Sequence, residues 1–265
     1  MKKLFFAFVG LIILTGAGCN KQNNQVIPAA SSANTYLYDN DYTSLQEDIN
    51  GDGKKELIKL TVERFEGYVT TTLYVNELSV IVPGYDPAGY FDVVDIDNKD
   101  NVKEIAVIDI GPSDDYTTSF YYFNGTNLLS MGTIPWTYKD MTFNGFGKII
   151  TKTRGKILDT WFYDDDFVIS ENHELVHVPK KLYARDTTVT LLAELPLQTS
   201  SLNSKIITTL QKGEVAKIVG CDDIAWCVIK KSDGVDGWFA VENFDMVKDV
   251  GMHAQDVFLG LSNAD

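Results

Sequence analysis

Three residues in the second half of the chain have the spacing of a hydrolytic zinc site. His173, Glu174 and His177 form an H-E-x-x-H pattern, in which two histidines on one helix face bind the metal and the glutamate polarises a metal-bound water. Pro179, however, disfavours helix at the residue before it. Residues 161–171 are also rich in the aromatic and β-branched types that favour strands. We therefore expect an extended segment, and a zinc metallopeptidase stays as an alternative hypothesis.

A second candidate for metal chemistry is an acidic loop near the start of the chain. Residues 48–56 read D-I-N-G-D-G-K-K-E, with oxygen-bearing side chains at positions 1, 3, 5 and 9 of the loop. Calcium prefers six to eight hard oxygen ligands, and alternate residues of a tight, glycine-bearing loop can converge on one ion. An EF-hand needs an acidic residue at position 12, which is Lys59 here. The EF-hand interpretation therefore fails.

The loop instead resembles the calcium loops of FG-GAP, or integrin-propeller-like, repeats. These loops read D-x-[DN]-G-D-G-x-x-[DE] and lead directly into a strand, which would begin at Leu57 in this chain. The resemblance implies a bound calcium ion. Its ligands would be the side chains of Asp48, Asn50, Asp52 and Glu56 and the backbone carbonyl of Lys54.

A second copy of the acidic loop begins 47 residues further along the chain. It has one residue more than the first copy and lacks the glycines, and its implied ligands are Asp95, Asp97, Asp100 and Glu104. Residues 143–148 form a third, degenerate copy without carboxylates. Repetition of an acidic loop followed by a strand predicts a blade-like structural repeat.

Both acidic loops also have a simpler explanation as solvated turns, since Asn-Gly and Asp-Gly are favoured in hairpin turns. Without an ion, however, the carboxylates gathered in each loop would repel one another at short range. We therefore expect calcium as a structural ion. Such an ion stabilises a sheet and performs no reaction.

The elements around these loops are predicted to be strands. The runs Glu56–Arg64 and Tyr68–Asn76 alternate polar and apolar residues, as half-buried strands do. Residues 103–111 are more continuously apolar, which predicts a central strand covered on both faces. We expect a mainly β protein with a calcium-loop domain at 35–184, built of β-sheet repeats like part of a propeller. A change in composition places the domain boundary near Ala184.

Residues 189–247 resemble the bacterial SH3-like domain of cell-envelope proteins. The segments that carry the resemblance are 195–197, 205–215, 226–230 and 233–239. The resemblance implies a small β-barrel of five or six strands over 185–250 that binds peptidoglycan or short peptides. Trp226, Trp238 and Phe239 are the aromatic residues that would form a ligand platform. Alternatively, the two tryptophans pack the barrel itself.

Three smaller features complete the C-terminal half. Cys221 and Cys227 flank a turn-like segment, and they are either a disulfide or two small buried apolar residues. Residues 251–265 are expected to form a tail. Within it, Val257, Phe258 and Leu261 have helical spacing, which predicts a short terminal helix.

The start of the chain has the pattern of a secretory signal. Residues 1–18 combine two lysines, an apolar run and small residues before Cys19. The stretch before Cys19 resembles the lipobox of bacterial lipoproteins, which implies a lipidated Cys19 on a flexible tether, 19–34, with the protein secreted and anchored to the outer face of the cell membrane. Ordinary secretory cleavage is the alternative.

The charge and the remaining motifs narrow the function. A formal net charge of −14 disfavours nucleic-acid binding. The sequence contains no nucleophile elbow, phosphate loop or dinucleotide fingerprint. As a whole, the arrangement resembles a type of surface lipoprotein of Gram-positive bacteria with a β-rich repeat region. We expect a non-catalytic, calcium-stabilised envelope lipoprotein, and the alternatives are the zinc metallopeptidase and a purely structural surface scaffold.

Overall fold

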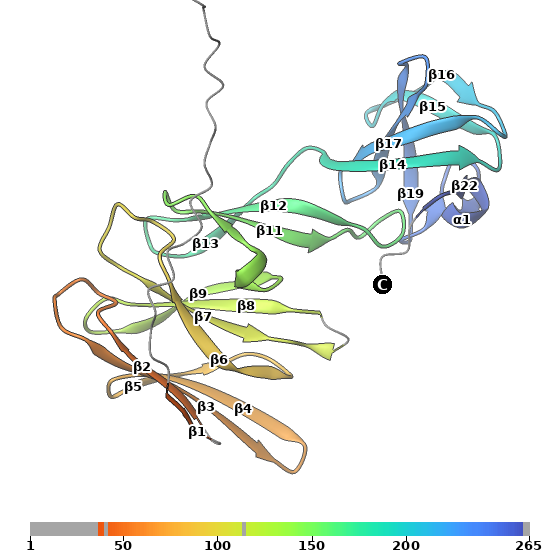
Figure 1. Cartoon of the computed structure of the whole chain (residues 1–265). Helices are drawn as coiled ribbons and strands as arrows, with labels where there is room; N and C mark the ends of the chain where they lie inside the picture. Colours follow the sequence, from red (N-terminus) through yellow and green to blue (C-terminus); the bar gives the residue numbers. More distant parts are fainter. Residues whose placement is uncertain (1–36, 40–41, 113–114, 262–265) are drawn as a thin grey trace, which may run out of the picture.

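The computed structural model describes residues 37–39, 42–112 and 115–261, and it is mainly β as predicted (Figure 1). The predicted signal, the lipidated Cys19 and the tether lie outside these residues. The described part contains one α-helix, of four residues, and no helix in it is long and apolar enough to span a membrane.

The N-terminal domain consists of three antiparallel sheets in which strand order follows chain order. The first sheet contains β1 (Leu37–Asp39), β2 (Tyr42–Glu47), β3 (Glu56–Phe65), β4 (Tyr68–Val75) and β5 (Leu78–Val82). The second contains β6 (Pro87–Val94), β7 (Glu104–Asp109), β8 (Thr117–Phe123) and β9 (Leu128–Pro135). After the 3-10 helix η2 (Tyr138–Asp140), the third contains β10 (Thr142–Phe143), β11 (Lys148–Arg154), β12 (Phe162–Ile169) and β13 (Leu175–Val178). In Figure 1 the sheets follow one another from the bottom of the view upward.

Strand β7 shows how the sheets are held together. All six of its residues are buried, as predicted for a central strand. Because successive side chains of a strand point to opposite faces, Ile105 and Val107 join the core shared with the first sheet. Ala106 and Ile108 join the core shared with the third sheet. The second sheet is therefore the middle layer of a three-sheet stack.

The C-terminal domain is a bent sheet around a single core. Its strands are β14 (Tyr183–Leu191), β15 (Leu195–Ser200), β16 (Asn203–Leu210), β17 (Val215–Cys221), β18 (Trp226–Lys231), β19 (Asp236–Glu242), β20 (Met246–Val247), β21 (Met252–His253) and β22 (Phe258–Leu259). The main path runs β16-β15-β19-β18-β17-β14-β22, with β20 and β21 attached to β19. The domain thus has more strands than the predicted five or six. Cys221 and Cys227, which face each other across β17 and β18, form a disulfide.

The short helix predicted in the C-terminal tail is present, but it is shorter than its apolar spacing suggested. Helix α1 spans only Ala254–Val257, and the two residues after it form β22, which pairs with β14. Val257 and Phe258 are both buried in the core of the C-terminal domain. Pairing with β14 satisfies the backbone of Phe258 and Leu259 as a strand, and this outweighs the helical spacing of the apolar residues. The start of β14 at Tyr183 lies beside the boundary predicted at Ala184.

The two domains meet at the tip of the β11–β12 hairpin. Ile157, Leu158 and Trp161 from this tip are part of the C-terminal core. The backbone N–H of Leu158 donates to the carbonyl of Phe244 at 2.6 Å. Asp223, in the turn closed by the disulfide, accepts the Tyr163 hydroxyl at 3.0 Å. The hairpin tip therefore packs into the C-terminal domain and connects it to the third sheet.

Candidate functional site

The two acidic loops and the degenerate third copy each join two consecutive, paired strands of a sheet. The first joins β2 to β3, the second β6 to β7, and the third β10 to β11. In the first two, the residue that closes the loop is a buried glutamate, Glu56 or Glu104. In the third, the corresponding residue is the buried Ile149, which pairs with Phe143. The structure therefore contains the predicted repeat of loop and strand three times.

In the first loop, side-chain oxygens of three candidate ligands accept hydrogen bonds from backbone N–H groups of the same loop. Asp48 accepts from Gly51 N at 2.8 Å through Oδ1 and from Gly53 N at 2.9 Å through Oδ2. Asn50 and Asp52 each accept one N–H from the residue two positions on. Gly51 and Gly53 have φ of 73° and 85°, a region that favours glycine. The glycines of the sequence pattern thus permit a loop that holds its own side chains.

The second loop follows the same plan with a different outcome. Glu104 Oε2 accepts the N–H of Ile96 at 3.0 Å, as Glu56 Oε2 accepts the N–H of Ile49 at 3.1 Å. Glu104 is fully buried, and its Oε1 has no hydrogen-bond partner; Asp95 Oδ1 is likewise buried and without a partner. Two carboxylate oxygens of the second loop are therefore buried without compensation.

Burial also changes the acidity of these groups. Desolvation raises the pKa of Glu104 to about 8, and the negative charges of Asp100 and Asp95 add to this increase. Burial raises the pKa of Asp95 as well, followed by the charge of Asp100. The charge of Lys103 opposes the increase at Asp95 without cancelling it, and the causes of the Glu104 shift include no nearby cation.

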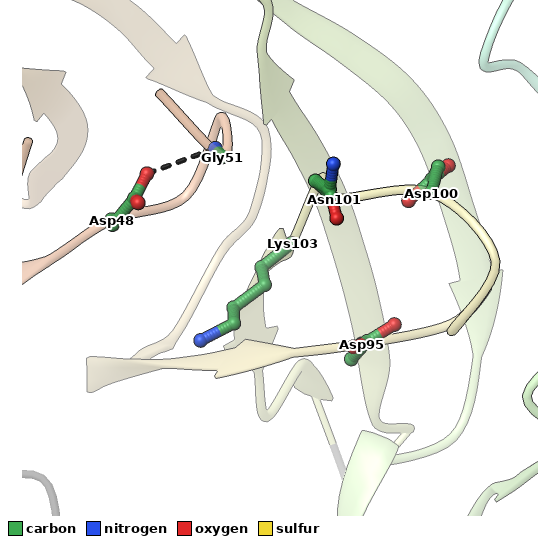
Figure 2. A pocket seen from close by; sticks show the side chains of 6 residues that line it. All are labelled: Asp48, Gly51, Asp95, Asp100, Asn101 and Lys103. Atoms are coloured by element: carbon green, nitrogen blue, oxygen red, sulfur yellow. Dashed lines mark hydrogen bonds between the residues drawn. The ribbon is translucent and has the colours of Figure 1, made fainter. Parts of the chain in front are cut away.

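A pocket lies between the two loops (Figure 2). The residues that line it are Asp48, Gly51, Asp95, Asp100, Asn101 and Lys103. Lys103 reaches away to Glu47, with 2.5 Å between Nζ and Oε1. In the conformation that the described residues adopt, no three His, Cys, Asp or Glu side chains are gathered around one metal position. Unpartnered carboxylate oxygens are nevertheless the hard donors that calcium takes, so the second loop fits a calcium ion by its chemistry.

The H-E-x-x-H pattern is not helical. His173 lies in a turn with φ of 58°, and His177 lies in strand β13, as the predicted extended segment requires. His173 stacks on Tyr122 with ring centroids 4.5 Å apart, and its Nε2 is 3.8 Å from Asp100 Oδ2. His177 Nε2 is 2.8 Å from Oδ1 of the buried Asp165. The two histidines are thus held by different partners and do not share one face of a helix.

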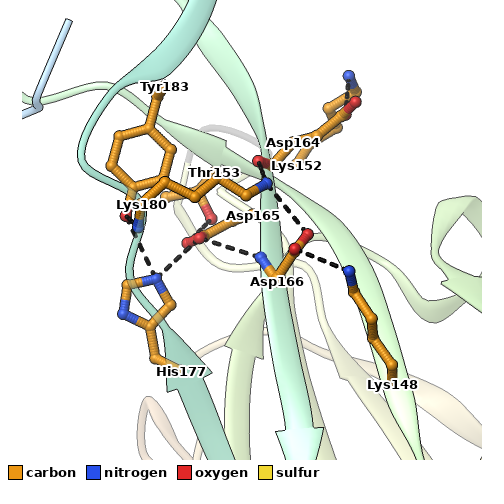
Figure 3. Close-up of polar contacts among 9 residues, drawn as sticks. All are labelled: Lys148, Lys152, Thr153, Asp164, Asp165, Asp166, His177, Lys180 and Tyr183. Carbon is orange, nitrogen blue, oxygen red and sulfur yellow. Dashed lines mark hydrogen bonds and ion pairs between the residues drawn. The ribbon is translucent and has the colours of Figure 1, made fainter.

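The surroundings of His177 form a polar cluster that sequence reasoning missed (Figure 3). Asp165 also accepts the hydroxyl of Thr153 at 3.1 Å. On the next residue, Asp166 forms ion pairs with Lys148 and Lys180; burial opposes ionisation, but the hydrogen bonds from these lysines prevail and lower the pKa of Asp166. The run of three aspartates at 164–166 was the sequence signal, but which of them is buried depends on strand β12.

The predicted aromatic platform of the C-terminal domain is only partly present. Val228 pairs with Trp238 and Trp226 with Ala240, so both tryptophans lie on the same face of β18 and β19 and both are partly exposed. Phe239 points to the opposite face. It is fully buried and packs against Phe258 with ring centroids 5.4 Å apart. Phe239 is therefore a core residue, and its assignment to the platform was wrong.

A glutamine that the sequence did not single out lies beside Trp238. Gln198 pairs with Trp238 across β15 and β19 and is 8% exposed. Its Nε2 donates to Asp249 Oδ1 at 3.1 Å, while its Oε1 is buried without a partner. Asp249 Oδ2 in turn accepts the backbone N–H of Ala240 at 3.2 Å. The face with both tryptophans therefore includes an unsatisfied hydrogen-bond acceptor.

Comparison with known proteins supports the C-terminal assignment. Searches of curated proteins and of solved structures gave no match. Residues 198–244, from β15 to the turn after β19, match the family model of the bacterial SH3 domain. The C-terminal part of the chain therefore contains a bacterial SH3 domain.

Proposed function

We propose that this protein is a non-catalytic binding protein of the cell envelope, whose SH3 domain holds peptidoglycan or a peptide ligand. The observation that carries the proposal is the partly exposed pair Trp226 and Trp238 on one face of a bacterial SH3 domain. We further propose that the protein is secreted and anchored by a lipidated Cys19 to the outer face of the membrane. The N-terminal sequence pattern supports the anchor.

The chemistry of this face suits a ligand with flat apolar surfaces and N–H or O–H donors. Tryptophan offers a large apolar area, on which sugar rings or peptide side chains stack. The buried Oε1 of Gln198 beside Trp238 lacks a hydrogen bond, and a buried acceptor without a partner is costly. Amide N–H groups, which stem peptides and N-acetylated sugars both carry, would be suitable donors.

Retention of the protein on purified, insoluble peptidoglycan tests the proposal. We expect Trp238→Ala to lose most of the retention of the wild type. Tyr85→Ala is the matched control, because it removes an aromatic side chain that is 84% exposed in the N-terminal domain. Retention of neither the wild type nor either variant would count against a peptidoglycan ligand. Equal retention of all three would move the binding surface away from Trp238.

Calcium is the proposed cofactor of the N-terminal domain. In the first loop it would be held by the side chains of Asp48, Asn50, Asp52 and Glu56 and the carbonyl of Lys54, and in the second loop by Asp95, Asp97, Asp100 and Glu104. The ion would give a partner to the buried oxygens of Glu104 and Asp95 that have no hydrogen bond. A ligand that binds only the folded state raises its stability. We expect a higher melting temperature in calcium than in EDTA, and identical melting curves would reject calcium.

The zinc metallopeptidase is a less favoured alternative. Its support is the sequence pattern alone, because His173 contacts Tyr122 and Asp100 whereas His177 contacts Asp165. Zinc analysis of the purified protein separates the two hypotheses. Stoichiometric zinc that is lost in His177→Ala would favour the peptidase. A purely structural scaffold would instead show calcium-dependent melting without retention on peptidoglycan.

A further inference from the structure

We infer that calcium binds in the second acidic loop, at Asp95, Asp97, Asp100 and Glu104, in preference to the first loop. This inference rests on the proposed calcium cofactor and specifies which loop holds the ion. The glycine-rich first loop is the better match to a calcium-loop pattern in sequence. In the structure, by contrast, the second loop has the greater need for a cation.

The two loops can be compared directly because one carboxylate oxygen of each closing glutamate, Oε2, makes the same backbone contact. Glu56 and Glu104 are both buried, and each accepts the backbone N–H of the isoleucine that follows the first aspartate of its loop. Only the second carboxylate oxygen distinguishes them. Oε1 of Glu104 is buried without any partner, whereas Oε1 of Glu56 is not among the unsatisfied buried atoms of the described residues.

The first aspartates of the loops differ in the same direction. Both carboxylate oxygens of Asp48 accept backbone N–H groups, from Gly51 and Gly53. Asp95 has a buried Oδ1 without a partner. A buried carboxylate oxygen without a hydrogen bond or a counter-charge is strongly unfavourable. An ion in the second loop would thus compensate two such oxygens, and an ion in the first would have to compete with existing hydrogen bonds.

The basic side chains next to the second loop form no hydrogen bond with the buried oxygens of Asp95 and Glu104. Lys103 lies against Glu47, at 2.5 Å. His173 Nε2 is 3.8 Å from Asp100, beyond hydrogen-bond distance. A dehydrated divalent cation, by contrast, is small enough to lie among carboxylates and to contact several oxygens at once.

The second loop also lies between its two counterparts. The N–H of Lys103 donates to the carbonyl of Ile49 in the first loop at 2.9 Å. Ile96 O accepts the N–H of Gly147 from the third copy at 3.0 Å. An ion that orders the second loop therefore stabilises the contacts of all three sheets, and its loss is expected to lower the melting temperature of the whole N-terminal domain.

Calcium titration of the full chain and of two isosteric variants, Glu56→Gln and Glu104→Gln, tests the inference. Binding is measured by calorimetry, and melting temperature is measured in excess calcium and in EDTA. We expect Glu104→Gln to lose both the binding heat and the calcium-dependent rise in melting temperature, and Glu56→Gln to keep both. Circular dichroism confirms that each variant is folded, and Asp95→Asn with Asp48→Asn provides a second matched pair if Glu104→Gln does not fold.

The results for the two variants and the wild type distinguish a preference for the second loop from calcium binding as such. Loss of binding in Glu56→Gln with retention in Glu104→Gln overturns the preference for the second loop but leaves calcium as the cofactor. Equal loss in both variants overturns the preference as well, because it makes the loops equivalent. Absence of binding by the wild type rejects the calcium cofactor itself.

Discussion

The buried residue that closes each loop shows how one position adapts to different surroundings. Glu56 and Glu104 occupy it in the first two copies, and Ile149 in the third. The isoleucine needs no counter-charge, and the third copy carries no carboxylates. A glutamate therefore closes the two acidic loops, and an apolar residue closes the loop without carboxylates. Of the two glutamates, Glu104 alone has a buried oxygen without a hydrogen bond among the described residues, and this is the position at which we infer an ion.

Glu104 gives the first prediction, a loss of stability as pH rises in the absence of calcium. Burial raises its pKa from 4.5 to about 8 in the folded protein. The folded state therefore binds this proton more tightly than the unfolded state, and the stabilisation is complete below pH 4.5 and disappears as pH rises through 8. One such proton changes the free energy of unfolding by at most about 1.4 kcal/mol per pH unit.

Urea unfolding in EDTA at a series of pH values measures this effect. We expect the free energy of unfolding of the wild type to decrease as the pH rises from 4.5 to about 8. The free energy of unfolding of Glu104→Gln should depend less on pH. Parallel profiles for the two proteins would show that Glu104 is already ionised in the folded state.

Residue types were predictable from the sequence, but their electrostatic state was not. The candidate ligands Asp95 and Glu104 were implied by the resemblance of the acidic loops to known calcium loops. The nearest lysine, Lys103, forms its ion pair with Glu47, which is a contact across 56 positions of the chain. Gln198 was missed for the same reason, because its partner Asp249 lies 51 positions away. Orphaned oxygens of this kind arise from tertiary packing and leave no local pattern.

At the scale of elements, alternation of apolar residues predicted the strands well. Residues 103–111 were expected to form a central strand, and β7 is buried throughout. Pro179 correctly indicated an extended segment at β13. The short C-terminal helix was overestimated, because apolar residues three apart fit both a helix and the docked strand β22. Short elements at chain ends are decided by the strand that they meet.

The β11–β12 hairpin gives the second prediction. A Cβ atom on Gly155 would lie 2.2 Å from Nε1 of Trp161, which donates to the carbonyl of Ile157 at 2.8 Å. Gly155→Ala must displace this indole from a buried site, and overpacking of this kind costs about 1–3 kcal/mol. We expect a lower urea midpoint. Lys156→Ala, at an exposed neighbouring position, is the control; equal midpoints for both variants would mean that the indole shifts without cost.

At the scale of the whole molecule, the chain has two structural units joined by a shared core. The sequence predicted two domains and a boundary near Ala184, beside the start of β14. It gave no indication that Leu158, 26 residues before that boundary, is buried in the core of the second domain. A hairpin from the third sheet thus completes the SH3 domain. The bacterial SH3 match at 198–244 covers less than the unit that has to fold together.

This shared core gives the third prediction, which concerns cooperativity between the domains. Leu158 is fully buried among residues of the SH3 domain, and its N–H donates to Phe244 O at 2.6 Å. Leu158→Ala removes this packing and leaves a cavity, which for buried leucines costs about 2–5 kcal/mol. We expect the SH3 domain to lose more stability than the N-terminal domain. Calorimetry should therefore show the transition broaden or separate into two.

Leu129→Ala is the control for the loss of a leucine side chain, because Leu129 is 41% exposed and lies in β9, away from the junction. It should leave the shape of the transition unchanged. A single sharp transition in Leu158→Ala, merely shifted to lower temperature, would mean that Asp223 and the backbone contacts of the hairpin tip couple the domains without the leucine.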